Sequence, residues 1–160
     1  MNLLINDYSF IVLASLLILL ITTLTWHLFK PRWATAAFLI TFAMLFTFQL
    51  TASTTADTVS SREELNNILA AGKPVLLELY SNFWLTCLRA KPDVDRLELE
   101  LADHSLVVRI NIGSTIGKSV REEYNVASVP TFIAFDQNGN EVFRQGGRVP
   151  RAEKLFRLIN

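Results

Sequence analysis

The chain of 160 residues carries 15 basic and 15 acidic side chains and has no formal net charge, which gives no support for nucleic-acid binding. This length allows one ordinary domain with some additional sequence. The charges are unevenly distributed, because residues 1–56 contain only Asp7, Lys30 and Arg32 as charged side chains. We therefore expect residues 1–56 and residues 57–160 to lie in different solvents.

Residues 1–56 contain two apolar runs, at about 8–29 and 33–50. A helix needs about 20 such residues to cross the hydrocarbon core of a bilayer, and the second run is near the short end of that range. The three residues between the runs, Lys-Pro-Arg at 30–32, are too few for anything but a tight turn. The sequence therefore predicts a membrane anchor in which two antiparallel transmembrane helices cross the lipid bilayer.

The orientation of this anchor follows from its positive charges. Lys30 and Arg32 lie in the turn between the two runs, and loops that carry lysine and arginine usually stay on the cytoplasmic side. We therefore expect a two-pass protein of a bacterial-type inner (plasma) membrane. Residues 57–160 are then expected on the periplasmic or extracellular side.

Two other interpretations of the apolar runs are open. Residues 34–50 could be the apolar part of a cleaved signal peptide, preceded by Lys30 and Arg32. The first run argues against this, because a cleaved signal rarely follows an earlier span. The two runs could also be buried helices of a water-soluble protein, but 160 residues cannot wrap a core around two uncharged helices.

The second part of the chain shows a pattern of alternating helices and strands. Residues 51–60 are rich in Ser, Thr and Ala and are typical of a linker. Ser61 and Glu64 then have the spacing of a capping box, which marks a helix start, and Asn-Gly at 138–139 indicates a hairpin turn. The predicted elements are helices at about 62–71, 86–103, 117–124 and 150–158 and strands at about 75–80, 106–112, 130–135 and 141–145.

This order of elements resembles the thioredoxin fold over residues 61–160. Three local features carry the resemblance: a strand at 73–80 that leads to the helix with Cys87, a Val-Pro loop at 126–132 like the family's cis-proline loop, and residues 135–139 followed by Gly146-Gly147. The resemblance implies an α/β fold with a central mixed sheet flanked by helices. Within the family, the strand and its spacing look most like the periplasmic C-terminal domain of the membrane thiol:disulfide interchange reductase.

The family's active site is Trp-Cys-x-x-Cys at a helix start, with a proline five residues after the second cysteine. Here residues 83–87 read Phe-Trp-Leu-Thr-Cys, and Pro92 is in place. The resemblance implies a degenerate active site, in which Cys87 stands for the resolving cysteine and Trp84 replaces the nucleophilic one. Cys87 could still form a mixed disulfide, or it could be a small apolar side chain of the core, as buried cysteines commonly are.

Glu78 lies in an apolar strand, where thioredoxins carry a buried acid beneath the active site. Burial would raise the pKa of this carboxyl group. The resemblance implies a proton relay to the resolving thiol. The alternative is an acid that is hydrogen-bonded to a local amide or to water, and Lys73 or Lys91 could pair with it.

Phe83 and Trp84 are expected to face the loop that contains Val129 and Pro130. In the family this surface receives polypeptides by backbone pairing, and tryptophan is enriched among the residues that dominate interface energies. A partner protein could therefore bind at Phe83, Trp84, Val129 and Pro130. Alternatively, Trp84 folds over the helix start and fills space there.

Two classes of function fit these residues. The first is a membrane-anchored, redox-inactive thioredoxin-like protein that binds other subunits of a membrane complex, or an extracytoplasmic protein, as an accessory or assembly subunit. The second is a monothiol thiol:disulfide oxidoreductase that works through Cys87 outside the membrane. We expect no metal and no other cofactor, because His27 and His104 have no partner at metal-ligand spacing.

Overall fold

The structure, a computed structural model, describes residues 9–28, 31–52 and 57–159. The chain forms two compact units, residues 1–55 and residues 56–160. The predicted ends of the first apolar run, Tyr8 and Phe29, lie outside the described residues, as does Lys30 of the predicted turn.

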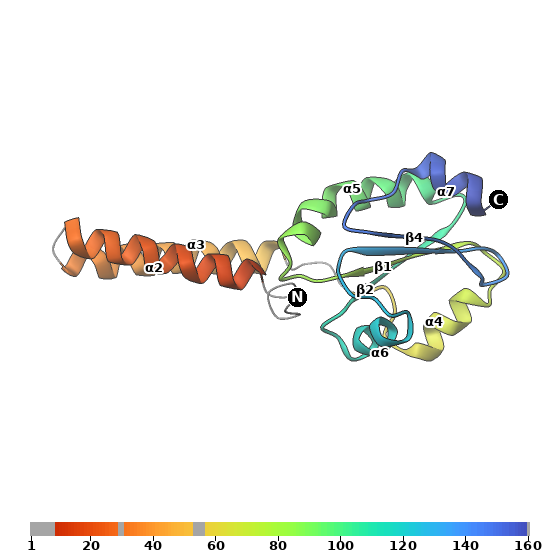
Figure 1. The fold of residues 1–160 in the computed structure, drawn as a ribbon, viewed down its shortest axis with the longest axis horizontal. Coiled ribbons are helices and arrows are strands. Elements are labelled where there is room, and N and C mark those ends of the chain that lie inside the picture. Colours follow the sequence, from red (N-terminus) through yellow and green to blue (C-terminus); the bar gives the residue numbers. More distant parts are fainter. Residues whose placement is uncertain (1–8, 29–30, 53–56, 160) are drawn as a thin grey trace. The chain divides into compact units, whose positions relative to one another are not determined.

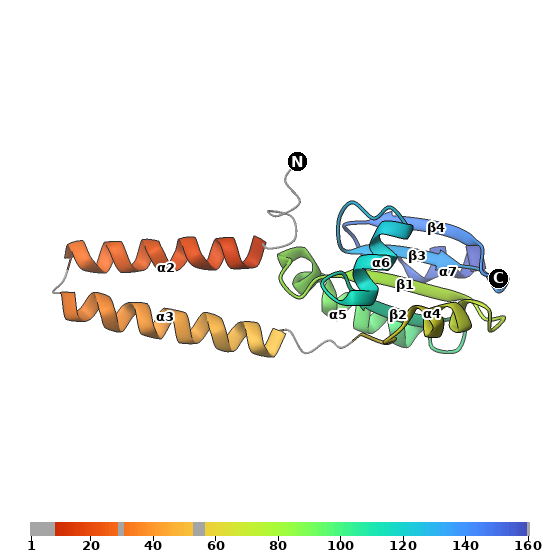
Figure 2. The same cartoon turned by 90° about the horizontal axis from the view of Figure 1, so that it is seen from below.

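The first unit contains helix α2 (Ser9–Leu28) and helix α3 (Pro31–Ala52), which contact each other and run antiparallel in Figures 1 and 2. Within α2, Ile11–Leu28 has a mean hydropathy of 2.2 and is long and apolar enough to cross a membrane. The apolar part of α3, Arg32–Phe48, is shorter. Among the described residues, one helix therefore meets the length and composition expected of a membrane span.

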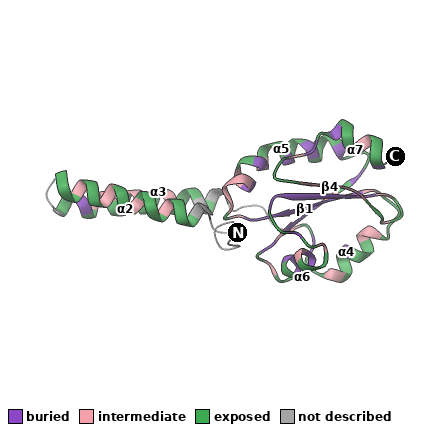
Figure 3. Cartoon of the chain, viewed as in Figure 1, coloured by how far each residue is buried: buried purple, intermediate pink, exposed green. Residues whose placement is uncertain are grey.

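The side chains of these two helices are suited to apolar surroundings. Most of their large apolar side chains are exposed, and much of the ribbon of α2 and α3 in Figure 3 has the green colour of exposed residues. The hydroxyl groups of Thr23, Thr25 and Thr47 donate hydrogen bonds to carbonyl oxygens four residues earlier, at 2.7 to 2.9 Å. These hydroxyl groups are therefore satisfied within their own helix, as threonine commonly is in helices.

The second unit is an α/β domain. Its elements are α4 (Arg62–Leu69), β1 (Val75–Tyr80), α5 (Leu85–Leu101), β2 (Leu106–Asn111), α6 (Thr115–Glu123), β3 (Thr131–Phe135), β4 (Glu141–Gly146) and α7 (Ala152–Ile159). The strands form one sheet in the order β2-β1-β3-β4. β2 pairs with β1 in parallel, and β3 and β4 are antiparallel to their neighbours, so the predicted mixed sheet is confirmed.

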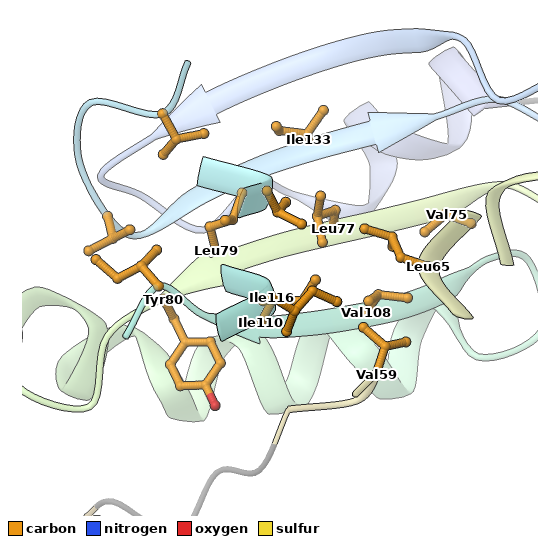
Figure 4. Packing of buried hydrophobic residues seen from close by; sticks show 14 of the residues in the cluster. Val59, Leu65, Val75, Leu77, Leu79, Tyr80, Val108, Ile110, Ile116 and Ile133 are labelled. Carbon is orange, nitrogen blue, oxygen red and sulfur yellow. The ribbon is translucent and has the colours of Figure 1, made fainter. Parts of the chain in front are cut away.

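Helices cover both faces of this sheet, with α4 and α6 on one face and α5 and α7 on the other (Figure 1). All six residues of β1 are buried, and alternate side chains point to opposite faces. The cluster on the first face, part of which Figure 4 shows, includes Val59, Leu65, Leu77, Leu79, Cys87, Val120 and Val129. The cluster on the second face includes Leu76, Val94, Phe132 and Leu155.

The predicted linker at residues 51–60 is too long at both ends. Helix α3 continues through Thr51 to Ala52. At the other end, Val59 is buried in the core, and the amide of Thr58 donates a hydrogen bond of 2.9 Å to the carbonyl oxygen of Arg109 in β2. Residues 57–60 therefore belong to the domain, because they pair with a strand and contribute to the core.

Local capping explains where several elements begin. The predicted cap of α4 is confirmed, since the Ser61 hydroxyl accepts from the amide of Glu64. Helix α6 begins two residues before its predicted start, because the Ser114 hydroxyl caps it by accepting from the amide of Gly117 at 3.1 Å. In the β3–β4 loop, Gly139 has a φ of +78°, a conformation that favours glycine and agrees with the predicted turn.

We predict that Gly117→Ala destabilises the domain. A Cβ atom at this position would overlap the carbonyl oxygen of Asn111 and lie 2.9 Å from the Cα atom of Ile112, so the backbone of α6 or β2 must move. Such overpacking costs about 1–3 kcal/mol in the free energy of unfolding. Pulse proteolysis in urea of the full-length protein in detergent measures this loss. Ser119→Ala, at an exposed position of the same helix, is the control and should change stability by less than about 0.5 kcal/mol.

Candidate functional site

Cys87 lies in the first turn of α5, immediately beyond the end of β1. Its side chain is buried, with 5% of its surface exposed, and it belongs to the same core cluster as Val129. The helix begins at Leu85, and the residue at the N-cap is Trp84, whose side chain makes no capping hydrogen bond. The thiol of Cys87 therefore lies at the start of a helix, as expected, but inside the core.

Phe83 and Trp84, which precede α5, differ in exposure. Phe83 has 38% of its surface exposed, whereas Trp84 is partly buried and packs against the core cluster that includes Cys87. Ser81 holds the turn, because its hydroxyl accepts from the amide of Phe83 at 3.2 Å and its carbonyl oxygen accepts from the amide of Trp84 at 3.4 Å. Trp84 thus fills space at the helix start and remains partly exposed.

Val129 and Pro130 form the loop before β3, and both are buried. The peptide bond between them is cis, as in the family's loop that this segment resembles. The carbonyl oxygen of Pro130 accepts a hydrogen bond of 2.8 Å from the amide of Gly147, and the Thr131 hydroxyl donates to the carbonyl oxygen of Ser128 at 2.6 Å. The loop is therefore fixed from both sides by backbone and side-chain contacts.

The sheet register brings these segments to one edge. Strand β3 is antiparallel to β1, and Thr131 at its start pairs with Leu79 near the end of β1. The residues that follow β1 and those that precede β3 consequently emerge side by side. Four residues predicted for binding, Phe83, Trp84, Val129 and Pro130, thus lie at the same end of the sheet as Cys87, but only Phe83 is well exposed.

Glu78 is buried in the middle of β1, with 1% of its surface exposed, and it faces a charged partner across the sheet. Arg109 of β2 pairs with it in register, and the Arg109 Nε donates to the Glu78 Oε2 at 2.7 Å. Lys73 and Lys91 were the partners considered from the sequence. Arg109 was missed, although an arginine within an apolar strand is itself a signal, because charged side chains are seldom buried unless they are paired.

Arg109 is also bound by carboxylates from α5. Its NH1 group donates to the Asp95 Oδ1 at 2.7 Å, and the Glu98 Oε2 lies 3.9 Å from the same NH1 group. Burial raises the pKa of Glu78 to about 7, and the charge of Arg109 opposes this shift. Arg109 thus joins β1, β2 and α5 through a single guanidinium group.

Tyr80 connects the same region to the first residues of the domain. Its ring lies 5.9 Å from the Arg109 guanidinium carbon, and its hydroxyl donates to the Asp57 Oδ1 at 3.4 Å. The Asp57 oxygen also accepts from the amide of Asn111 at 2.6 Å. Burial, together with the charge of Asp57, raises the pKa of Tyr80.

Within the described residues, no three His, Cys, Asp or Glu side chains gather as a metal site would require.

Three features together define a protein of the thioredoxin class. They are a mixed four-stranded sheet, a helix after strand β1 with Cys87 in its first turn, and an adjoining cis-proline loop. The family model of the thioredoxin-like domain matches residues 61–160, and the chain belongs to this family.

Several known proteins are similar to this domain. The chain is 32% identical over 97 residues to the thioredoxin-like protein HCF164 of Arabidopsis thaliana, described as chloroplastic, which covers 61% of this chain and 36% of that protein. It is 28% identical over 110 residues to the thiol:disulfide interchange protein DsbD of Yersinia pestis, covering 64% of this chain and 18% of that protein. The chain thus spans well under half the length of these relatives, and the expected similarity to a thiol:disulfide interchange protein is confirmed.

A solved structure agrees with the fold. The Drosophila melanogaster thioredoxin Deadhead superposes with a TM-score of 0.52 at 22% identity, covering 64% of this chain and 94% of that one. At this level of identity the likeness supports the thioredoxin fold alone.

We predict that Arg109→Met destabilises the domain strongly above neutral pH and less in acid. The folded-state pKa of Glu78, about 7, lies above its ordinary value of 4.5. The wild-type free energy of unfolding should therefore fall as the pH rises from about 4.5 to about 7, because the folded state binds this proton more tightly. Without Arg109, the charged Glu78 is buried and uncompensated, which costs about 3–5 kcal/mol at about pH 8.

Amide hydrogen exchange of β1 in the full-length protein in detergent measures this cost. At about pH 5, where Glu78 is protonated in both proteins, the difference should shrink by more than about 1 kcal/mol. Asp95→Asn, at a half-exposed partner, should cost less than about 1 kcal/mol at either pH. A cost of Arg109→Met that does not change with pH would contradict the role assigned to Glu78.

Proposed function

We propose that this chain is a membrane-anchored thioredoxin-like protein that binds a polypeptide partner at the edge formed by residues 81–87 and 128–131, without a disulfide cycle of its own. In this proposal it is an accessory or assembly subunit of a larger membrane complex. The observation that carries the proposal is the residue at the start of α5: Trp84 occupies the N-cap, and the only cysteine of the chain, Cys87, is buried behind it.

The chemistry of disulfide exchange supports this proposal. A dithiol reductant passes two electrons to a disulfide when its second thiol attacks the mixed disulfide and closes an internal S–S bond. One cysteine cannot close such a bond. In the family pattern the nucleophilic thiol stands where this chain has Trp84, so the step that makes the family catalytic lacks its first reactant.

The surface at this edge suits a protein contact. Phe83 is 38% exposed, and the next residue, Trp84, is partly buried and packs against the core cluster that includes Cys87. Large aromatic side chains that are held by packing contribute much of the energy of protein interfaces, because they bury apolar area with little loss of side-chain freedom. The partner is another subunit of the complex or an extracytoplasmic protein.

Membrane attachment is supported by α2 and α3. Their exposed apolar side chains form a surface too large for a water-soluble helix pair, so lipid or a protein subunit covers it. We propose two spans, with Lys30 and Arg32 on the cytoplasmic side and the thioredoxin-like domain on the periplasmic or extracellular side of a bacterial-type plasma membrane. The qualifying length of Ile11–Leu28 supports the first span, and the shorter α3 would form the second.

The second candidate function is a monothiol oxidoreductase, which the place of Cys87 in the first turn of α5 favours. In that reaction the Cys87 thiolate attacks a disulfide of a partner or of a small thiol compound, an S–S bond to Cys87 forms, and one thiolate leaves. A second thiol from solution must then release Cys87. The burial of Cys87 opposes this route, because the attacking sulfur must reach its target.

A photo-crosslinker separates the two candidates. We predict that p-benzoylphenylalanine at position 83 of the full-length protein in its own cells gives an adduct of defined mass. The adduct should persist in Cys87→Ala and fall by about tenfold in Trp84→Ala, because the aromatic contact and not the sulfur holds the partner. The same crosslinker at Leu106, which has a similar exposure of 41% at the start of β2, is the control and should give no such adduct.

Two results would count against this proposal. If Cys87→Ala abolishes the adduct, and wild-type cells contain a reductant-sensitive species of similar mass, the monothiol function is correct. If position 83 gives no adduct while Trp84→Ala is expressed at the wild-type level, the edge does not bind a partner. Hydrogen exchange of β1 in Trp84→Ala shows that any loss is not due to unfolding.

A further inference from the structure

The edge formed by residues 81–87 and 128–131 is the proposed docking edge. A second surface lies beside it, where β4 ends and α7 begins. It is a groove of about 440 Å³, and we call it the basic groove. Its lining residues are Gln145, Gly146, Arg148, Val149, Pro150, Arg151 and Lys154. Three of these carry a positive charge and none carries a negative one. Its volume is in the range of ligand-binding sites.

The three cations of the basic groove are exposed, and none of the ion pairs found in residues 57–159 uses them. Their neighbour Arg144 is different, because its Nε and NH2 groups both donate to the Glu141 carboxylate at 2.7 Å. Arg151 also borders an adjacent groove that contains acidic residues, whereas Arg148 and Lys154 line only the basic groove. Positive charge is thus concentrated here without an internal counter-charge.

The basic groove is continuous with the cis-proline loop. Gly146, in its wall, pairs with Thr131 in the sheet register, and a Cβ atom on Gly146 would lie 3.6–3.9 Å from Thr131, Ser128 and Pro130. The next residue, Gly147, donates its amide to the Pro130 carbonyl oxygen at 2.8 Å. A polypeptide that reaches Val129 and Pro130 therefore arrives at the basic groove within a residue or two.

We propose that the basic groove binds the carboxylate side chains of an acidic segment of the partner polypeptide. This inference rests on the proposed function and adds the chemical class of the partner. Arginine forms bidentate hydrogen bonds with carboxylates, and charge complementarity fixes the register of a docked chain. A polypeptide fits better than a lipid headgroup, because two lining residues, Gln145 and Gly146, end the outermost strand of the sheet, and an extended chain can pair with the outer edge of such a strand.

The test uses ¹⁵N-labelled full-length protein in a neutral detergent and hexaglutamate as the probe, with hexaglutamine as the uncharged control. We expect hexaglutamate to shift the amide resonances of residues 145–154 and of the loop at 128–131. Its dissociation constant should rise by about tenfold between about 50 and about 300 mM sodium chloride, because exposed charges are screened. Hexaglutamine should give no shifts there.

Matched charge variants complete the test. Arg148→Gln with Arg151→Gln and Lys154→Gln should weaken hexaglutamate binding by about tenfold or more, since each lost contact is charge-assisted. Lys73→Gln with Arg89→Gln and Lys118→Gln removes the same charge at exposed positions elsewhere and should leave binding unchanged. Equal effects of the two variants, or the absence of hexaglutamate shifts, would overturn the proposal. Shifts of residues 145–154 produced by lysophosphatidylglycerol but not by hexaglutamate would also overturn it, in favour of a lipid headgroup.

The same variants distinguish this inference from the proposed function. The first outcome concerns the variant in which Arg148, Arg151 and Lys154 are replaced by Gln. If the adduct from position 83 keeps its full yield in this variant, the basic groove does not bind the partner, while the proposal for the docking edge is unaffected. If hexaglutamate binds the basic groove but position 83 gives no adduct, the proposed function fails and the groove remains a site for carboxylates. Trp84→Ala should not change hexaglutamate binding, because the probe has no apolar group for that contact.

Discussion

The geometry of this protein depends on the burial of β1 between two layers of helices. All six residues of β1 are buried, and the strand pairs with β2 in parallel and with β3 in antiparallel orientation. This pairing places the chain after β1, with Trp84 and Cys87, beside the chain before β3, with the cis peptide bond at Pro130. The candidate site is therefore a consequence of sheet topology, which brings together residues that are far apart in the sequence.

A buried charge at the centre of that strand is held by one cation. Glu78 accepts from Arg109, which also contacts Asp95 of α5, and Arg109 pairs through its backbone with Thr58 at the start of the domain. A buried ion pair adds little net stability, but removing one partner is costly because it leaves the other charge buried and uncompensated. Glu78 is thus connected to α5 through Arg109.

Much of this architecture could be predicted from the sequence, and the rest fails for identifiable reasons. The bounds of β1 follow from an apolar run interrupted only by Glu78, and the loop at Pro130 follows from its resemblance to the family. The pairing of Glu78 with Arg109 could not be predicted, because strand register decides which residues meet across a sheet. Val59 was missed because one apolar residue in a polar segment has no periodicity, and sequence left open whether Trp84 points into the core or away from it.

We propose that Trp84 and its surroundings bind a partner while Cys87 takes no part in disulfide exchange. The most direct measurement is the redox state of Cys87 in growing cells, obtained by acid trapping, alkylation of free thiols with a mass-tagged maleimide, and analysis of the full-length chain. We predict that Cys87 is a free thiol throughout, also after mild oxidation of the cells, because its sulfur is buried and has no second cysteine in the chain. A stoichiometric mixed disulfide at Cys87 that forms and is reduced during growth would contradict this account.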